Sequence, residues 1–431
     1  MRFPGLLVTV IIGSVPAAQA QLEPATASYE PAAAASLASA WGGQLATRPR
    51  LLGDPAGYRS ALERTGIVFD LYYNQLFGVV LDGGSSSPDD EPYSGSVDLL
   101  VLADFERMGV VAGGEALMHV KAHYERNINP RADALSDPFD DADGNRWFYI
   151  DQLWYQHRFL DRRVQLRLGY LDQQTIIDRN AYANSEDRQF MATFLDNNNA
   201  TVPLAIGIGA AAFFEPTEWL SWRVSLADKD GRAGRAGFDT AFDDLRGYFR
   251  YFELHLHARI DGEEGPLTGT YRFGLISDPR RKEVFGSSSS SGEPKTDRED
   301  LGFYASFDQL VFRERRGGDQ GLGLFLRYGY RDGEVNQVEH FWSAGGQYRG
   351  ALDARPDDVV GLGAYGAHTS SEYQASTQGS TGREVGCEVY YLVQLTPWLA
   401  FTPDVQYLNR PGARSGDDDV WVGGARVRIA F

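Results

Sequence analysis

Four of the seven histidines form two pairs at strand spacing, His119 with His123 and His255 with His257. Residues an even number of positions apart share one face of a strand, so each pair offers two nitrogen ligands to a metal. The pairs are far apart in the chain, and the single cysteine, Cys387, joins neither. Because too few ligands converge, we expect no metal and no other cofactor.

Two further chemical motifs are incomplete. Serines and aspartates are plentiful, which leaves a Ser-His-Asp hydrolase open, but no G-x-S-x-G elbow occurs, and that motif belongs to another fold. The acidic run 137–143, which precedes Gly144, suggests a calcium loop. With Gly144 at the sixth position of such a loop, Phe139 and Ile150 stand at its first and twelfth positions, where calcium needs oxygen ligands. We therefore expect no enzyme.

The charged residues follow a clearer pattern, because they alternate with apolar ones. In 248–260, for example, Leu254 and Leu256 share one parity, and Glu253 and His255 share the other. A charge that faced lipid would cost about 2–4 kcal/mol, so the polar parity should face water inside a barrel. The residues that we predict to line this lumen or contact a solute are Glu125, Trp154, Arg158, Arg167, Glu253, Arg327, Glu388, Asp404, Gln406 and Arg428.

About sixteen such alternating segments follow one another, which predicts an all-β fold, a transmembrane antiparallel β-barrel. The predicted strands are 67–80, 95–105, 115–126, 149–160, 164–171, 204–214, 219–227, 248–260, 269–278, 301–311, 321–331, 339–349, 358–368, 384–395, 398–408 and 420–431. Their connections tend to alternate short and long. This asymmetry is typical of outer-membrane barrels, whose short turns face the periplasm.

The N-terminal region divides into three parts. Residues 1–20 have Arg2, a short apolar core and Ala18-Gln19-Ala20, which predicts a secretory signal peptide cleaved after Ala20. Residues 21–53 form an Ala-rich segment. Residues 54–66 predict a short periplasmic helix, with Asp54 as N-cap, Pro55 in the first turn and Gly66 as the C-terminal stop. The barrel should occupy 67–431, and both of its ends should lie on the periplasmic side.

Composition narrows the class of partner. The formal charge of −18 argues against nucleic acid. Small solutes, namely sugars and ions, are the expected partners, together with outer-membrane lipid and lipopolysaccharide; homo-oligomerisation stays open. The long connection 172–203 contains Asp178, Arg179, Asn180, Asp187 and Arg188, and it is long enough to fold into the lumen and narrow it.

Several stretches resemble one family. Pro397 to Gly412 matches the "PW…PD.QY…PG" signature of OprB-type carbohydrate-selective porins, and 66–73, 151–160 and 164–171 are similar to other parts of that family. The resemblance runs from about Gly53 to Phe431. It implies a sixteen-stranded barrel that passes monosaccharides by facilitated diffusion, and it implies that the barrel-assembly machinery reads the terminal Phe431.

The sequence thus predicts an outer-membrane porin for small solutes, with carbohydrates such as monosaccharides as the expected cargo. Arg158, Arg167, Arg327 and Arg428 would supply cations, and Trp154 a surface on which sugar rings stack. A general or ion-selective porin stays open as an alternative. An outer-membrane enzyme on a barrel scaffold and a structural envelope anchor are the less favoured alternatives.

Overall fold

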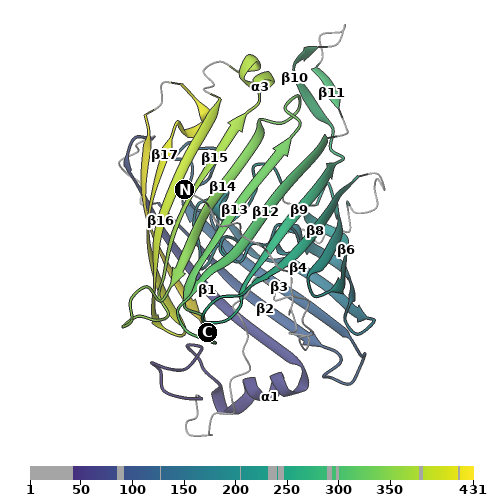
Figure 1. Cartoon of the computed structure of the whole chain (residues 1–431), viewed down its shortest axis with the longest axis vertical. Helices are drawn as coiled ribbons and strands as arrows, with labels where there is room; N and C mark the ends of the chain where they lie inside the picture. The colour runs from purple at the N-terminus through teal and green to yellow at the C-terminus, as the bar shows by residue number, and fades with distance from the viewer. Residues whose placement is uncertain are drawn as a thin grey trace, which may run out of the picture.

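The computed structural model is a closed barrel of sixteen antiparallel strands, as the alternating pattern predicts (Figure 1). The structure describes residues 42–84, 92–126, 128–203, 205–231, 240, 247–288, 294–297, 300–377, 382–415 and 418–431. The predicted signal peptide lies outside the described residues. None of the helices in the described part of the chain has the length and apolar character needed to cross a membrane.

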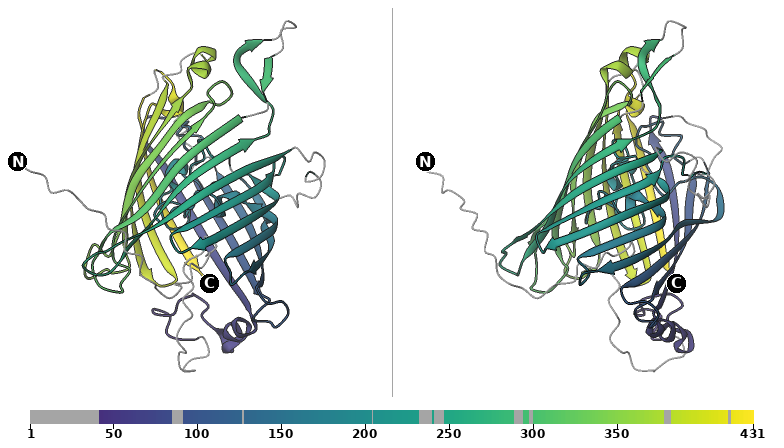
Figure 2. Two further views of the ribbon diagram at one scale, coloured as in Figure 1. Left: turned by 45° about the vertical axis from the view of Figure 1, so that its right-hand side comes forward. Right: turned by 90° about the vertical axis from the view of Figure 1, so that its right-hand side faces the viewer.

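Each barrel strand pairs with its neighbours in the chain, and β1 closes the ring by pairing with β18. The strands cross the barrel obliquely (Figure 2). The barrel strands are β1 (Ile67–Asp82), β2 (Tyr93–Asp104), β3 (Gly114–Arg126), β4 (Arg146–Phe159), β5 (Val164–Asp172), β6 (Ile206–Thr217), β7 (Leu220–Asp228), β8 (Tyr248–Ile260), β9 (Leu267–Asp278), β12 (Asp300–Arg313), β13 (Gly321–Arg331), β14 (Val338–Arg349), β15 (Val359–Thr369), β16 (Arg383–Thr396), β17 (Leu399–Asn409) and β18 (Val420–Ala430).

The other elements lie in the connections. The β9–β12 connection contains the hairpin β10 (Lys282–Ser288) and β11 (Pro294–Asp297), and α3 (Ser371–Ser376) follows β15. Both stand at the rim that carries the long connections, whereas α1 (Tyr58–Thr65) and the chain end lie at the opposite, short-turn rim (Figure 1). The remaining elements are η1 (Pro55–Gly57), η2 (Gln173–Thr175), α2 (Thr193–Asp196) and η3 (Pro411–Ala413).

The predicted strand ends move by a few residues, and the N-terminal helix is shorter than predicted. It begins at Tyr58 because Ala56 and Gly57 have positive φ values of 49° and 74°, which break the helix after a single 3₁₀ turn. The Asp54 carboxylate accepts hydrogen bonds from the backbone N–H groups of Arg59 and Ser60, at 2.9 and 3.3 Å. Gly66 ends the helix with a φ of 98°, as predicted.

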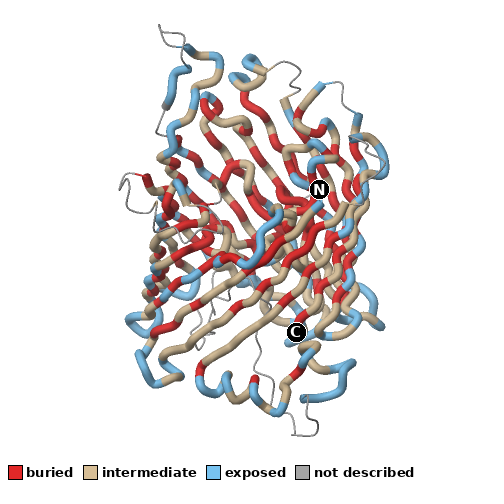
Figure 3. The backbone as a smooth tube through the Cα atoms, turned by 180° about the vertical axis from the view of Figure 1, so that it is seen from behind, coloured by how far each residue is buried: buried red, intermediate tan, exposed pale blue. Residues whose placement is uncertain are grey.

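Buried and less buried positions alternate along the strands, as a two-residue period requires (Figure 3). In β18, Val422, Arg426 and Arg428 are buried, whereas Trp421 is exposed on the other face. The exposed parity is apolar along most strands, which suits contact with lipid.

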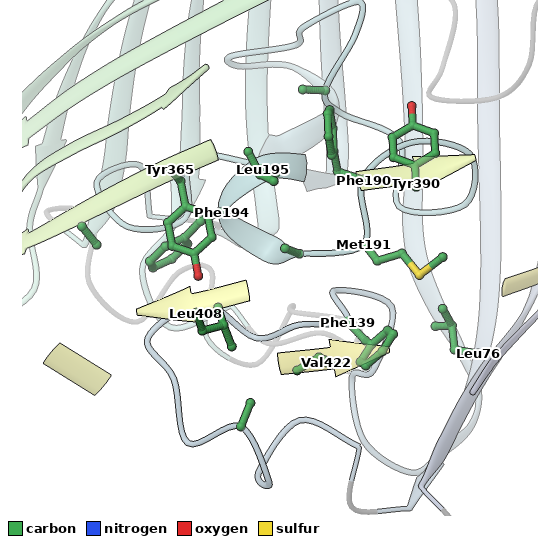
Figure 4. Packing of buried hydrophobic residues seen from close by; sticks show 14 of the residues in the cluster. Leu76, Phe139, Phe190, Met191, Phe194, Leu195, Tyr365, Tyr390, Leu408 and Val422 are labelled. Atoms are coloured by element: carbon green, nitrogen blue, oxygen red, sulfur yellow. The ribbon is translucent and has the colours of Figure 1, made fainter. Parts of the chain in front are cut away.

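The core lies inside the barrel rather than between two layers. Its members come from the barrel wall and from two connections that enter the lumen, which we call the first inner loop (residues 128–145) and the second inner loop (residues 173–203). In Figure 4, Phe190 of the second inner loop lies beside Tyr390 of β16, and Phe194 of α2 lies beside Tyr365 of β15. Their ring centroids are 5.1 and 5.4 Å apart.

Candidate functional site

Backbone groups of the second inner loop bind charged side chains of the barrel wall. The Glu388 carboxylate of β16 accepts hydrogen bonds from the N–H groups of Met191 and Ala192, at 2.7 and 2.9 Å. On the next strand but one, Arg426 donates to the carbonyl oxygens of Glu186 and Gln189, at 2.7 and 2.9 Å. These hydrogen bonds hold the loop against β16 and β18.

β13 and β8, which lies across the ring from β18, hold the same loop in the same way. Arg327 of β13 donates to the carbonyl oxygens of Leu195, at 3.0 Å, and of Ala183, and its Nε lies 3.2 Å from Asp178 Oδ2. Glu253 of β8 accepts a hydrogen bond from the N–H of Asp178 at 2.8 Å. The second inner loop therefore spans the lumen, as its length predicts.

The first inner loop docks beside it. Gln406 of β17 donates to the Pro138 carbonyl oxygen at 2.8 Å. The two inner loops join through backbone hydrogen bonds, from Asp140 N–H to Met191 O at 2.8 Å and from Thr193 N–H to Asp137 O at 3.0 Å. The two loops therefore pack as one unit inside the barrel.

Glycines of the barrel wall leave room for these loops. A Cβ at Gly323 would lie 2.0 Å from the Tyr182 ring, and a Cβ at Gly363 would lie 2.9 Å from both Leu195 and Phe190. Such distances are shorter than real Cβ contacts, so larger residues there would displace the loop. Such glycines are a sequence feature that indicates the inward-folded loops, which the alternation of polar and apolar residues does not indicate.

The tip of the second inner loop, residues 184–189, is only half-buried and so meets solvent inside the barrel. Glu186 forms an ion pair with Lys121 of β3 at 3.0 Å, and Asp187 forms one with Arg428 of β18 at 2.5 Å. Arg188 donates to Gln394 Oε1 of β16 at 3.1 Å. The narrowed passage is thus lined by charges of both signs that are largely paired.

Burial and neighbouring charges shift the acidity of the loop carboxyls. Burial, with Glu186 and Asp143 nearby, raises the pKa of Asp140 to about 7. Burial alone would also raise the pKa of Asp187, but Arg428 and Ser185 hold that pKa below its ordinary value. Asp187 is therefore ionised at neutral pH and can keep its ion pair.

Several residues that we predicted to line the lumen lie inside the barrel but under the loops. Glu253, Arg327 and Glu388 have no exposed surface, and Asp404 and Gln406 are 4% and 1% exposed. In this arrangement a solute does not reach them, because the loops cover them. Glu253, Arg327, Glu388 and Gln406 hydrogen-bond the loops, whereas Asp404 accepts a hydrogen bond from Gln406 of its own strand.

Of the other predicted residues, Arg158 and Glu125 are half-buried, whereas Arg428, Arg167 and Trp154 are buried. Arg428 contacts the tip, Arg158 forms an ion pair with Glu115 at 2.6 Å, and Glu125 is half-buried towards the long-loop end of β3. Arg167 lies 3.9 Å from the centre of the Trp154 ring and covers it, so that face is not open for stacking with a sugar. The roles of these residues towards a solute stay predictions. Lys121 and Glu186 join them at the passage, although they were not among the predicted site residues.

The histidines that suggested a metal have other partners. His119 lies between Asp98 and Asp151, at 2.9 and 3.1 Å, and His255 contacts Glu253 at 2.5 Å. Within the described residues, no group of three or more His, Cys, Asp and Glu side chains is arranged to hold a metal ion.

A barrel whose lumen is narrowed by inward-folded loops is the architecture of a porin, and the comparisons agree. The model of the carbohydrate-selective porin, OprB family, matches residues 90–431. The chain belongs to this family. It is an outer-membrane porin for sugars.

Relatives match it over most of their length. Porin B of Pseudomonas aeruginosa is 23% identical, and the match covers 88% of this chain and 91% of that protein. The putative porin QuiX of Acinetobacter baylyi is also 23% identical, over 89% and 93%. Among solved structures, the high-pH structure of Pseudomonas putida OprB superposes with a TM-score of 0.79 at 20% identity, over 90% of this chain and 99% of that one.

Proposed function

We propose that the tip of the second inner loop, residues 184–189, is the selective part of a passive channel for neutral sugars of monosaccharide size. The observation that carries this proposal is the placement of the tip. It is half-buried, it meets solvent inside the barrel, and it is tied to β3, β16 and β18 by Lys121, Gln394 and Arg428.

The chemistry of the tip suits a polyhydroxylated solute. Each sugar hydroxyl both donates and accepts hydrogen bonds, and the tip offers amide, hydroxyl, carboxylate and guanidinium groups within one short segment. The ion pairs of Glu186 and Asp187 reduce the net field in the passage, which favours a neutral solute over an ion. Weak hydrogen bonds of this kind allow the solute to bind and to leave.

The channel performs no chemical step in this proposal. His119 and His255 contact the carboxylates of Asp98 and Glu253. Glu388 uses its carboxylate to accept a hydrogen bond from a backbone N–H of the loop. We further propose that the short-turn rim faces the periplasm, that cleavage follows Ala20, and that Phe431 is the residue read during barrel assembly. The alternation of connection lengths and the position of the chain end support this orientation.

Liposome swelling with the purified protein tests sugar selectivity. D-glucose should enter faster than a neutral non-sugar solute of similar size. Equal rates would show a general porin instead. A reversal potential measured across a salt gradient distinguishes a neutral-sugar channel from an ion-selective porin. The ion-selective porin would give a large potential and the neutral-sugar channel a small one.

A further inference from the structure

The outer surface of the barrel carries a row of basic residues at the long-loop rim. His340 of β14 is directly opposite His368 of β15, and His368 is directly opposite Arg383 of β16. Directly paired residues of antiparallel strands have Cβ atoms about 4.5–5.5 Å apart, so the three side chains are immediate neighbours. We call them the basic row.

Each member of the basic row faces away from the lumen. The residues next to them in the chain, Phe341, Ala367 and Glu384, have no exposed surface and point inward. Since side chains alternate along a strand, the basic row must point outward. The His340 side chain is 45% exposed, and Arg383 is exposed.

Aromatic residues place the row at the depth of the lipid headgroups. Tyr330 is the partner of His340 on β13, and Tyr328 and Trp342 form the next outward pair towards the barrel centre. Below them the outward pairs are apolar, as in Leu326 with Ala344. Aromatic girdles mark the membrane interfaces of such barrels, so the basic row stands at the interface on the long-loop side.

The row is built to donate hydrogen bonds. The Tyr328 hydroxyl lies 2.8 Å from His340 Nδ1, which leaves Nε2 as the outer ring nitrogen. The charged groups that act on His368 are Arg383 and His340. The Glu339 carboxylate opposes the row, because its Oε1 lies 3.9 Å from His340 Nε2.

We propose that the basic row binds a phosphate group of the lipid in the surrounding leaflet. A phosphate presents acceptor oxygens with negative charge at the level of the aromatic girdle, and two imidazoles followed by an arginine offer matching donors in one line. The ligand class is a phosphorylated lipid headgroup. This surface is separate from the lumen and does not depend on the cargo.

Native mass spectrometry of the folded full-length protein in detergent tests the proposal with defined probes. The probes are diphosphoryl lipid A, the same lipid without phosphates, and inorganic phosphate. We expect the variant His340→Gln/His368→Gln/Arg383→Gln to bind diphosphoryl lipid A about tenfold more weakly than the unmodified protein. Glu339→Gln should bind it more tightly, because the opposing carboxylate is gone.

Arg250→Gln is the matched control. Arg250 also faces outward at the long-loop end of its strand, but its cross-strand partners are Leu226 and Ser277 rather than basic residues. This variant should keep its affinity. Heat-modifiable migration in electrophoresis confirms that each variant is folded.

Three results would overturn the proposal. They are unchanged lipid A binding by the triple variant, an equal loss in Arg250→Gln, and equal binding of the lipid without phosphates. Binding of inorganic phosphate with no preference for the lipid would show a free-anion site instead, and that result also counts against a lipid headgroup.

Discussion

Replacement of Glu388 by Gln should release part of the second inner loop. The carboxylate of Glu388 accepts hydrogen bonds from two buried N–H groups, those of Met191 and Ala192. Glutamine has nearly the same shape but only one acceptor oxygen, and its NH₂ group cannot accept. One backbone N–H is therefore left without a partner.

The cost follows from that single unsatisfied donor. A buried donor that loses its acceptor costs about 1–3 kcal/mol. Because about 1.4 kcal/mol corresponds to a tenfold change in an equilibrium constant, local opening around Met191 should become about 5- to 150-fold more frequent. Asp404 still accepts a hydrogen bond from Gln406, and Arg426 still donates to the carbonyl oxygens of Glu186 and Gln189, so the barrel itself should stay folded.

Hydrogen–deuterium exchange read by mass spectrometry measures this opening directly. Peptides that contain residues 190–195 should exchange faster in Glu388→Gln by the factor given above, whereas peptides from β16 should not change. Glu218→Gln is the control, because Glu218 is exposed in the β6–β7 turn. Identical exchange around Met191 in the two variants would refute the idea that Glu388 anchors the loop.

Four other perturbations test the same picture. Deletion of 180–198 should raise single-channel conductance, and unchanged conductance would show that this loop does not narrow the passage. Lys121→Gln should shift the reversal potential towards cation selectivity, because Glu186 loses its ion pair, and Glu186→Gln should shift it the other way. Arg59→Ala should lower the free energy of unfolding by at least about 2 kcal/mol, because the buried guanidinium donates to the carbonyl oxygens of Phe69 and Phe431 across the β1–β18 seam. The loss is measured as a lower temperature at which the folded band disappears in electrophoresis. The exposed Arg64→Ala should show no such loss. Docking of the inner loops raises the pKa of Asp140 from its ordinary 3.8 to about 7. The docked loops therefore bind this proton more tightly, so docking is strongest below pH 3.8, weakens as the pH rises to 7, and is weakest above pH 7. After correction for the intrinsic exchange rate, which itself rises with pH, residues 135–142 should therefore be more protected at pH 5.5 than at pH 8, and Asp140→Asn should remove that difference in protection.

The strand pattern could be predicted well because it is local. The alternation in 248–260 and 321–331 gives those two strands with the observed ends. Which face each side chain occupies also follows, since Arg327 and Glu388 point inward as their parity requires. The break at Ala56 was missed because a positive φ at a non-glycine residue leaves little trace in the sequence.

The candidate site could be predicted only in part. Parity identified Glu253, Arg327 and Glu388 as inward residues, but it could not show that the loops cover them. That cover depends on contacts between residues far apart in the chain, such as the N–H of Met191 with Glu388. Gly323 and Gly363 indicate that something packs closely against the barrel wall, but a glycine in a strand does not identify the side chain that packs there.

The amino-acid sequence by itself determined the barrel, the inward and outward faces of its strands and the family of the protein, because a period of two residues and short motifs are properties of neighbouring residues. Only the tertiary structure decided which inward charges face the passage and which hold the loops. It also decided that His340, His368 and Arg383 stand in one row, since the register between strands brings together residues that the chain keeps apart.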